Sequence, residues 1–246
     1  MLVDSPLADV GAGADVVLSD AAAHHLSRVL RLRDGAAIEV SDGAGHRADA
    51  VLTATGARMT SEVDAEVAHL PAIHVLQGLP RGRKHDDVVR MLTELGVDRI
   101  TAVVAERTQS PPDPTKSAKL IERWGAVARG ASEQARRSRL PQVGGPVALA
   151  DALADLDEDT LLLAAHLGAT TDPLAALAGS AASVVAVAVG PEGGWSPAEA
   201  GRLQSAGAVL VSLGNSVLRT EHAAMVLAGV VAAGTGRMAL PARPWD

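Results

Sequence analysis

Hydrophobic and polar residues alternate in short runs along the first 70 residues. DVVLS (15–19), AIEVSDGAGHRADAVLTAT (37–55) and MTSEVDAEVAHL (59–70) all show this period of two, and SDGAGH (41–46) supplies a glycine-rich turn. This pattern predicts short strands and a hairpin. One helix is predicted over DAAAHHLSRVLRLR (20–33), which Gly35 follows. Residues 1–70 are therefore expected to form a small β-rich domain.

Beyond residue 70, continuous apolar runs alternate with segments of helical period. The predicted strands are AIHVLQGLP (72–80), RITAVVAE (99–106), TLLLAAHLG (160–168), VVAVAVG (184–190) and AVLVSLGNS (208–216). HDDVVRMLTELGV (85–97) and TKSAKLIERWGAVARGASEQARR (115–137) are predicted helices, and PQVGGP (141–146) is interpreted as a divider. Continuously apolar strands that alternate with helices indicate an α/β domain with a parallel sheet covered on both faces. We assign residues 71–246 to it.

The run Val184–Val189 ends abruptly in Gly190-Pro191-Glu192-Gly193-Gly194. In open parallel sheets, ligands bind beyond the carboxyl ends of the strands. Ser196-Pro197-Ala198-Glu199 has the pattern of a capping box with proline at the first helical position, so a helix is predicted from Trp195 to Gln204. A bare-backbone loop leading into a helix N-terminus suits a polar ligand. Glycines alone fit a plain turn equally well, but a plain turn has no need of Glu192.

Arg219, Thr220 and Glu221 stand together at another predicted helix start. A purely structural interpretation would make Thr220 the cap of that helix and Glu221 a favourable partner of the helix dipole. Arg219 opposes the dipole unless an anion lies nearby, which favours a functional arginine. The chain has neither a Walker phosphate loop nor a placed dinucleotide fingerprint.

Composition narrows the class of protein. Of 246 residues, 48% are hydrophobic and 21% are charged, which is typical of a globular protein. There is no cysteine, no run long enough to span a membrane, no signal-peptide pattern at the N-terminus, and no metal-ligand spacing among the eight histidines. We therefore expect a cytoplasmic protein with no metal and no membrane partner.

Charge is unevenly distributed in this chain of net charge −7. Basic clusters occur at RVLRLR (28–33), RGRKH (81–85) and RRSR (136–139), and each taken alone fits a solvated surface. The chain has no Phe and no Tyr, which excludes nucleic-acid stacking on those two residue types.

Two motifs in the second half resemble a known family. VGPEGGWSPAE (189–199) followed by VSLGNSVLRTEHAA (211–224) is similar to the RsmE family of SPOUT methyltransferases. The resemblance covers nearly the whole chain, because three further segments match segments of the family in the same order. They are HHLSRVLRLRDG (24–35), GLPRGRKHDDVVRMLTELGVDRITAVVAERTQ (78–109) and RWGAVARGASEQARRSRLP (123–141). The chain departs from the family at MLVD, where an Arg-Phe-Phe segment is common, and at His222, which is often Thr.

The resemblance implies an α/β fold in two parts. Residues 1–70 would be a PUA-like β-barrel that binds RNA, and residues 71–246 a SPOUT α/β domain with a C-terminal trefoil knot. The protein would be a homodimer that uses S-adenosylmethionine to methylate N3 of a uridine in 16S ribosomal RNA, within an assembled small subunit. The implied cofactor-binding residues are His166, Leu167, Gly168, Gly190, Glu192, Gly193, Leu213, Gly214, Ser216 and Leu218.

For catalysis, Arg219 is expected to stabilise charge developing on the uracil, and Glu221 to accept the N3 proton. RNA contacts are expected from the three basic clusters, through Arg28, Arg31, Arg33, Arg81, Arg83, Lys84, Arg136, Arg137 and Arg139. Two alternatives stay open at this point. One is a SPOUT methyltransferase acting on transfer RNA or another ribosomal site, and the other is a non-catalytic RNA-binding assembly factor.

Overall fold

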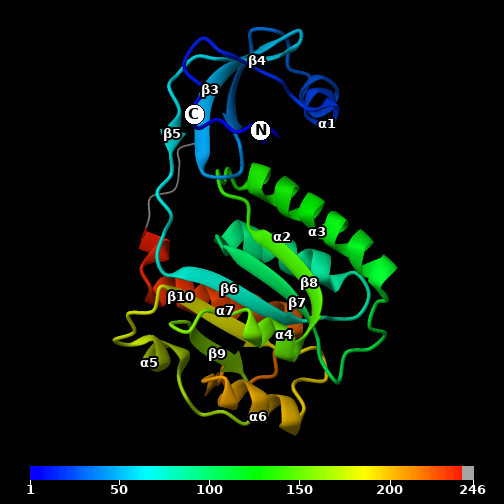
Figure 1. The fold of residues 1–246 in the computed structure, drawn as a ribbon, viewed down its shortest axis with the longest axis vertical. Coiled ribbons are helices and arrows are strands. Elements are labelled where there is room, and N and C mark those ends of the chain that lie inside the picture. Colours follow the sequence, from blue (N-terminus) through cyan, green and yellow to red (C-terminus); the bar gives the residue numbers. More distant parts are fainter. Residues whose placement is uncertain (240–246) are drawn as a thin grey trace. The chain divides into compact units, whose positions relative to one another are not determined.

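The computed structural model describes residues 1–239, apart from the side chains of Asp20, Ala21, His25 and Val29. The chain forms two compact units (Figure 1). The first comprises Met1–Ala68 and Ser132–Leu140, and the second comprises His69–Ala131 and the chain from Pro141 onward. The sequence predicts residues 132–140 in the second part. It joins the first because Leu140 donates its N–H to the Gly43 carbonyl and Glu133 accepts from the Leu2 N–H.

The first unit is built on a five-stranded antiparallel sheet. Its order is β1-β4-β3-β2, and β5 pairs with β3. The predicted hairpin is confirmed, because β2 and β3 flank a turn in which Gly43 and Gly45 have positive φ. Alternate side chains such as Val40, Ala48 and Met59 form the core. The strands are β1 (Asp15–Val16), β2 (Ala37–Ser41), β3 (His46–Thr53), β4 (Gly56–Met59) and β5 (Asp64–Ala65).

The helix predicted over 20–33 is shorter and less regular than expected. It consists of α1 (Asp20–His24) and a π-helical turn, η1 (His25–Val29). Arg31 has a φ of 55°, and the Leu32 N–H donates to the Leu26 carbonyl. The left-handed backbone at Arg31 therefore ends the helix that the apolar spacing alone would have continued.

The second unit contains a six-stranded parallel sheet in the order β11-β9-β10-β6-β7-β8. β8 corrects one prediction, because the expected divider 141–146 is mostly strand. A Cβ at Gly145 would collide with the Ala102 carbonyl on β7, so glycine here permits close pairing at a bulge. The strands are β6 (Ala72–Gly78), β7 (Arg99–Val104), β8 (Gln142–Ala148), β9 (Leu161–Ala165), β10 (Val184–Val189) and β11 (Val209–Val211).

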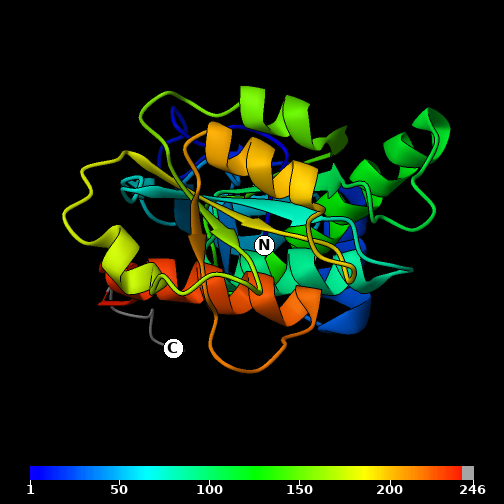
Figure 2. The ribbon, with the colours of Figure 1, turned by 90° about the horizontal axis from the view of Figure 1, so that it is seen from below.

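Helices cover both faces of this sheet (Figure 2). The core on one face joins α2, α3 and α7 to alternate strand residues, and that on the other joins α4 and α6. β10 is buried at all six positions, as its apolar run predicts. The helices are α2 (Lys84–Leu95), α3 (Pro114–Gln134), α4 (Leu149–Ala154), α5 (Pro173–Leu177), α6 (Pro197–Ser205), α7 (Thr220–Gly234) and the 3-10 turn η2 (Arg237–Ala239).

The predicted fold class is confirmed: an antiparallel N-terminal sheet is followed by a parallel α/β sheet. The trefoil knot stays a prediction. Among the described residues, no helix combines the length and the apolar character needed to span a membrane.

Candidate functional site

A cavity of about 600 Å³ lies where three strand ends of the second unit meet. Loops that follow β9, β10 and β11 form its wall, and these are the loops singled out in the sequence. Parallel strands place their carboxyl ends at one edge, which is why residues far apart in sequence converge there. The cavity is lined by Lys84, Ala165, His166, Leu167, Val189, Gly190, Pro191, Glu192, Gly194, Ser212, Leu213, Gly214, Ser216, Val217, Leu218, Arg219, Thr220 and Ala223.

Most of the predicted cofactor-binding residues line this cavity, but two do not. Gly168 lies next to it and donates its N–H to His166 Nδ1 at 3.1 Å. Gly193 lies on the other side of its loop, against Arg107. Of the predicted catalytic pair, Arg219 lines the cavity and Glu221 is buried behind it.

The Gly190–Gly194 loop is held against β6 by close backbone packing. A Cβ at Gly78, the last residue of β6, would overlap Pro191, and a Cβ at Gly190 would lie 2.9 Å from the Gly194 carbonyl carbon. Gly194 itself has a φ of 66°. These positions accept only glycine without rearrangement, which explains the glycine-rich sequence.

The predicted capping box that follows this loop is confirmed. The Ser196 hydroxyl accepts from the Glu199 N–H at 3.2 Å, and Glu199 Oε2 accepts from the Ser196 N–H at 2.9 Å. Glu199 is buried, and its other oxygen accepts from the Glu106 N–H at 2.8 Å. This carboxylate therefore ties the segment after β7 to the start of α6.

Thr220 is not the cap of α7, because Arg219 occupies the N-cap position and Thr220 is the first helical residue. The Thr220 hydroxyl instead donates to the Gly190 carbonyl at 2.5 Å and accepts from Gln77 Nε2 at 2.7 Å. These buried bonds join β6, β10 and α7 beneath the cavity. Gln77 is not among the residues predicted from the sequence, although it stands as a polar residue in the otherwise apolar strand β6.

A lysine lies between the two acidic residues of the site. Lys84 Nζ is 3.2 Å from Glu192 Oε1 and 3.9 Å from Glu221 Oε1. Burial acts to raise the pKa of Glu192, but hydrogen bonds from backbone N–H groups, including that of Arg81, and from Lys84 hold this pKa below its ordinary value. Glu221 Oε2 is buried and has no hydrogen-bond partner among the described residues. Lys84 was assigned to RNA binding from the sequence, whereas the structure places it in the cavity.

The other predicted RNA-binding residues occupy different environments. Arg28, Arg31 and Arg33 are exposed on the first unit, as is Arg136. Arg81 and Arg83 are exposed on the second, and Arg83 Nε is 3.7 Å from Asp86. Arg137 is half-buried. Arg139 packs beside Gly45 and donates to the Glu66 carbonyl, so it supports the first unit.

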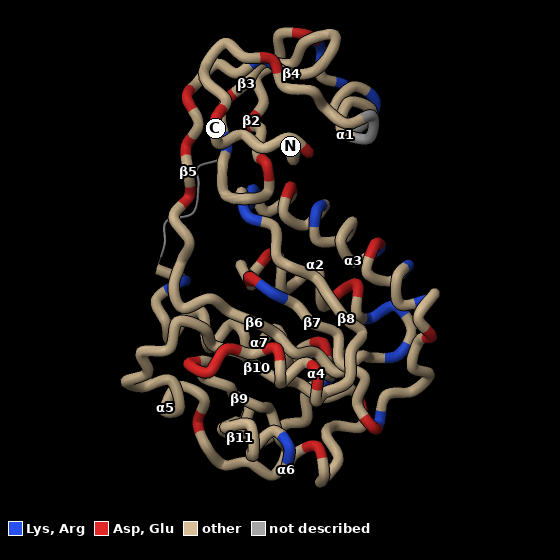
Figure 3. The backbone as a smooth tube through the Cα atoms, viewed as in Figure 1, with Lys and Arg blue, Asp and Glu red and all other residues tan. Residues whose placement is uncertain are grey.

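Figure 3 shows Lys and Arg, as well as Asp and Glu, on elements of both units. Within the described residues, no three His, Asp or Glu side chains converge as a metal site would require.

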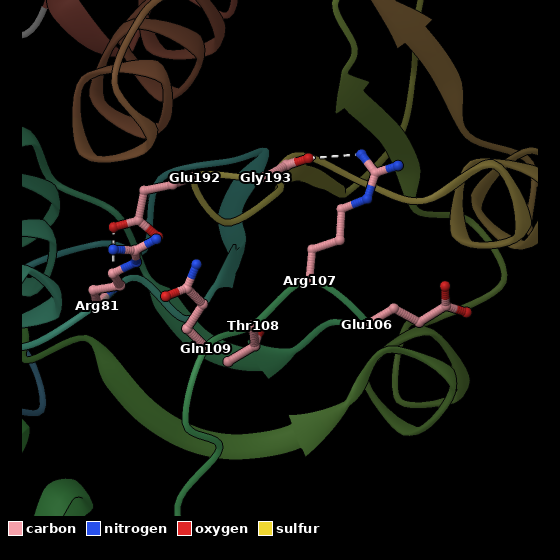
Figure 4. A pocket seen from close by; sticks show the side chains of 7 residues that line it. All are labelled: Arg81, Glu106, Arg107, Thr108, Gln109, Glu192 and Gly193. Atoms are coloured by element: carbon pink, nitrogen blue, oxygen red, sulfur yellow. Dashed lines mark hydrogen bonds between the residues drawn. The ribbon is translucent and has the colours of Figure 1, made fainter.

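A second cavity, of about 490 Å³, adjoins the Gly190–Gly194 loop on its other side (Figure 4). Arg107 Nη1 donates to the Gly193 carbonyl at 2.7 Å and so holds the loop from this side. Arg107 is not among the residues predicted from the sequence, and its place three residues after β7 was the available signal. The cavity is lined by Arg81, Glu106, Arg107, Thr108, Gln109, Glu192 and Gly193.

Comparison with known proteins identifies both parts of the chain. Residues 68–232 match the model of an RNA methyltransferase domain, and residues 18–58 match that of an RNA methyltransferase PUA domain. Two curated relatives are both named ribosomal RNA small subunit methyltransferase E. The one from Mycobacterium bovis is 34% identical, over 92% of this chain and 88% of the relative. The one from Synechocystis is 32% identical, over 87% and 71%.

Solved structures agree with these matches. Ribosomal RNA small subunit methyltransferase E from Neisseria gonorrhoeae, bound to S-adenosyl methionine, superposes with a TM-score of 0.82. It is 29% identical, and the match covers 96% of each chain. A putative methyltransferase from Legionella pneumophila in complex with the cofactor SAM has the same TM-score and identity, over 95% of this chain and 96% of that one. The matches extend over both units, and the chain therefore belongs to the RsmE family of RNA methyltransferases.

Proposed function

We propose that the protein transfers a methyl group from S-adenosylmethionine to N3 of a uridine in 16S ribosomal RNA. The supporting observation is the cavity formed by the three strand-end loops, in a chain of this family. Relatives that share about a third of its residues carry the name of a small-subunit ribosomal RNA methyltransferase.

The residues around the cavity suit the proposed cofactor. Val189, Leu213 and Leu218 offer apolar walls for an adenine ring, and the backbone at Gly190 and Gly214 offers polar groups without side-chain obstruction. Glu192 places a carboxylate near a ligand that carries a sulfonium and an ammonium group. A volume of about 600 Å³ lies within the range of roughly 300–1,000 Å³ that is usual for small-molecule sites. When bound, S-adenosylmethionine supplies an activated methyl group.

The chain's own residues would position the uridine and move one proton. Arg219 is exposed at the cavity and can stabilise negative charge that develops on a uracil oxygen. Glu221 is assigned as the acceptor of the N3 proton, so the base gains a methyl group and loses a proton. Its buried carboxylate lies 3.9 Å from the Lys84 ammonium, which offsets the charge of both acidic residues.

The same proposal covers assembly and the RNA partner. We propose a homodimer, because outward residues of α7 are apolar: Val226 is exposed, and Met225 and Val230 are only partly buried. A second copy could cover them with the same surface.

The exposed arginines Arg28, Arg31, Arg33 and Arg136 are proposed phosphate contacts on an assembled small subunit.

Methylation assays would test the function directly. Purified protein should be incubated with labelled S-adenosylmethionine and, separately, with free 16S rRNA, assembled small subunits and transfer RNA. We expect 3-methyluridine in 16S rRNA, located by mass mapping, with the assembled subunit as the better substrate. Methylation of transfer RNA alone would favour a SPOUT methyltransferase that acts on transfer RNA. Cofactor binding or RNA binding without methyl transfer would contradict the assignment as an enzyme.

A variant pair would test the role of Arg219. Arg219→Ala should lower the rate at saturating substrate by about 10²-fold or more, because the charge on the uracil loses its stabilising partner. Its affinity for S-adenosylmethionine, measured by calorimetry, should stay within about threefold. Arg202→Ala is the matched control, since Arg202 is exposed on α6 and outside the cavity. Equal rates for the two variants would remove Arg219 from the mechanism.

A further inference from the structure

Two further cavities adjoin the proposed cofactor cavity in series. The first, drawn in Figure 4, shares Glu192 with the cofactor cavity. A third cavity, of about 610 Å³, shares Arg81 and Gln109 with the first. We call these two adjoining hollows the side groove. Beyond the residues drawn in Figure 4, the side groove is lined by Leu79, Pro80, Gly82, Asp86, Ser110, Pro111, Pro112, Lys116, Lys119, Leu120, Arg123 and Trp124.

The side groove holds cations that the protein leaves uncompensated. Lys116 Nζ is paired with Asp113 at 3.2 Å, and Arg123 is paired with Asp86. Arg81 and Lys119 are exposed, and within residues 1–239 neither side chain forms an ion pair. Glu106 and Glu192 balance Arg81 and Arg107 in the first cavity, but the third cavity has four cations against one acid, Asp86, and therefore marks a place for an anionic ligand.

The remaining lining suits an extended ligand with alternating chemistry. Leu79, Pro111, Pro112 and Leu120 supply apolar surface in the third cavity. Gln109 offers an amide donor and an amide acceptor to both cavities, and in Figure 4 its amide is directed toward Arg81 and Glu192. Phosphates can contact Arg81 and Lys119, while sugar or base faces lie on the proline and leucine surface. Because no Phe or Tyr is available for stacking, phosphate contacts must supply most of the affinity.

Arg107 links the side groove to the cofactor cavity. Its guanidinium donates to the carbonyls of Gly193 and Trp195, at 2.7 and 3.4 Å. Both lie in the segment whose other side faces the cofactor cavity. A strand lying in the side groove would therefore run up to the loop beside the methyl donor.

We propose that the side groove binds the single-stranded RNA segment next to the target uridine, with phosphates on Arg81 and Lys119 and a polar contact to Gln109. This inference rests on the proposed function. It adds Lys119 and Gln109, which the sequence did not single out, and it gives Arg81 a defined place.

A double variant would test it. Arg81→Ala with Lys119→Ala removes both free cations and leaves the Arg81 backbone N–H that supports Glu192. Arg90→Ala with Arg202→Ala is the control, since both residues are exposed outside the side groove and the net charge also changes from −7 to −9. The ligand is a single-stranded fragment of 16S rRNA that spans the uridine methylated by the wild type, or an oligouridylate of about ten nucleotides.

The side-groove variant should bind the fragment at least about fivefold more weakly than the control at about 0.15 M salt, and the slope of log affinity against log salt should fall by about 1.4. Affinity for S-adenosylmethionine and the melting temperature should match the control. Equal RNA affinity and slope for the two variants would overturn the proposal, as would a parallel loss of cofactor affinity.

Two further results separate the sources of failure. Oligouridylate should compete with the RNA fragment for binding to the protein, and polyglutamate of equal charge should not. Competition by polyglutamate but not by oligouridylate would identify a site for an acidic protein and overturn the RNA proposal. If wild-type protein methylates no RNA, the proposed function fails, and the comparison of fragment affinities still decides the side groove.

Discussion

Glycine serves two different purposes within the Gly190–Gly194 loop. From the sequence, Gly190 and Gly193 are both predicted cofactor-binding residues. In the structure, a Cβ at Gly190 would lie 2.9–3.0 Å from backbone atoms of Gly194 and Trp195, whereas a Cβ at Gly193 would lie 3.0–3.2 Å from the Arg107 side chain. Backbone cannot move aside as a side chain can, so the two positions should respond differently to alanine.

Gly190→Ala should weaken S-adenosylmethionine binding at least tenfold, which is about 1.4 kcal/mol, because the loop that lines the cavity must rearrange. Gly193→Ala should change this affinity by less than about threefold, since only Arg107 needs to shift. Calorimetric titration of both variants measures the difference. A tenfold loss in Gly193→Ala with an intact Gly190→Ala would show that the loop faces the ligand in the opposite way.

His85 is a buried titratable residue that should make stability depend on pH. Its ring packs on Trp124 with centroids 4.2 Å apart, and neither ring nitrogen has a partner among the described residues. Burial lowers the pKa of His85 to about 3. The unfolded chain therefore binds a proton below about pH 6.5 that the native state does not bind, so stability is fully present above that pH and falls as pH decreases toward 3.

Between pH 7 and pH 5, this one residue should lower the free energy of unfolding by about 2 kcal/mol. His85→Leu has no titrating group there, so its stability should fall by about 2 kcal/mol less than that of the wild type over the same interval. Urea denaturation at the two pH values measures both. The same pH dependence in variant and wild type would mean that burial does not lower the pKa of His85 in the native state.

At the scale of elements, a single hydroxyl joins three segments of the sheet domain. Thr220 at the start of α7 bonds to Gln77 on β6 and to Gly190 at the end of β10. Thr220→Val keeps the shape of the side chain but removes both hydrogen bonds. The buried Gly190 carbonyl then loses the hydroxyl that donates to it. We expect a loss of about 1–3 kcal/mol in the free energy of unfolding.

Thr220→Ser is the matched control, because it keeps the hydroxyl and should recover most of the stability. The valine variant should also bind S-adenosylmethionine more weakly, since Gly190 and Arg219 both line the cavity. Chemical denaturation and calorimetry give the two values. Equal stability of the valine and serine variants would show that packing, and not hydrogen bonding, holds these elements together.

Elements specified by neighbouring residues could be predicted from the sequence, and those specified by distant residues could not. The α6 capping box needs only Ser196 and Glu199, three residues apart, and it is confirmed. β8 was missed because Gly145 looks like a turn until Ala102 of β7 packs against it. The loops around the cavity followed from strand ends and family motifs. Lys84 was misplaced because its partner Glu192 lies 108 residues further along.

At the scale of the whole molecule, the second unit has one helix whose outer surface is unusually apolar. The inner residues of α7, such as Leu227 and Val231, are fully buried in the sheet core. On its outer side, Val226 is 41% exposed, and Met225, Gly229 and Val230 are partly buried. An apolar helix face of this kind indicates an interface, and a homodimer with two-fold symmetry would bury two copies of it together.

Light scattering at micromolar concentration should therefore report about twice the 25.0 kDa chain mass. Val226→Asp places two carboxylates in the proposed interface, one from each copy, and their desolvation and mutual repulsion should shift the protein toward monomer. Val17→Asp is the control, because Val17 is 73% exposed on the first unit, and this variant should keep the wild-type mass. A monomeric wild type would exclude the dimer. A dimeric Val226→Asp variant with wild-type affinity between subunits would instead place the interface on another surface and leave the apolar face of α7 to a different partner.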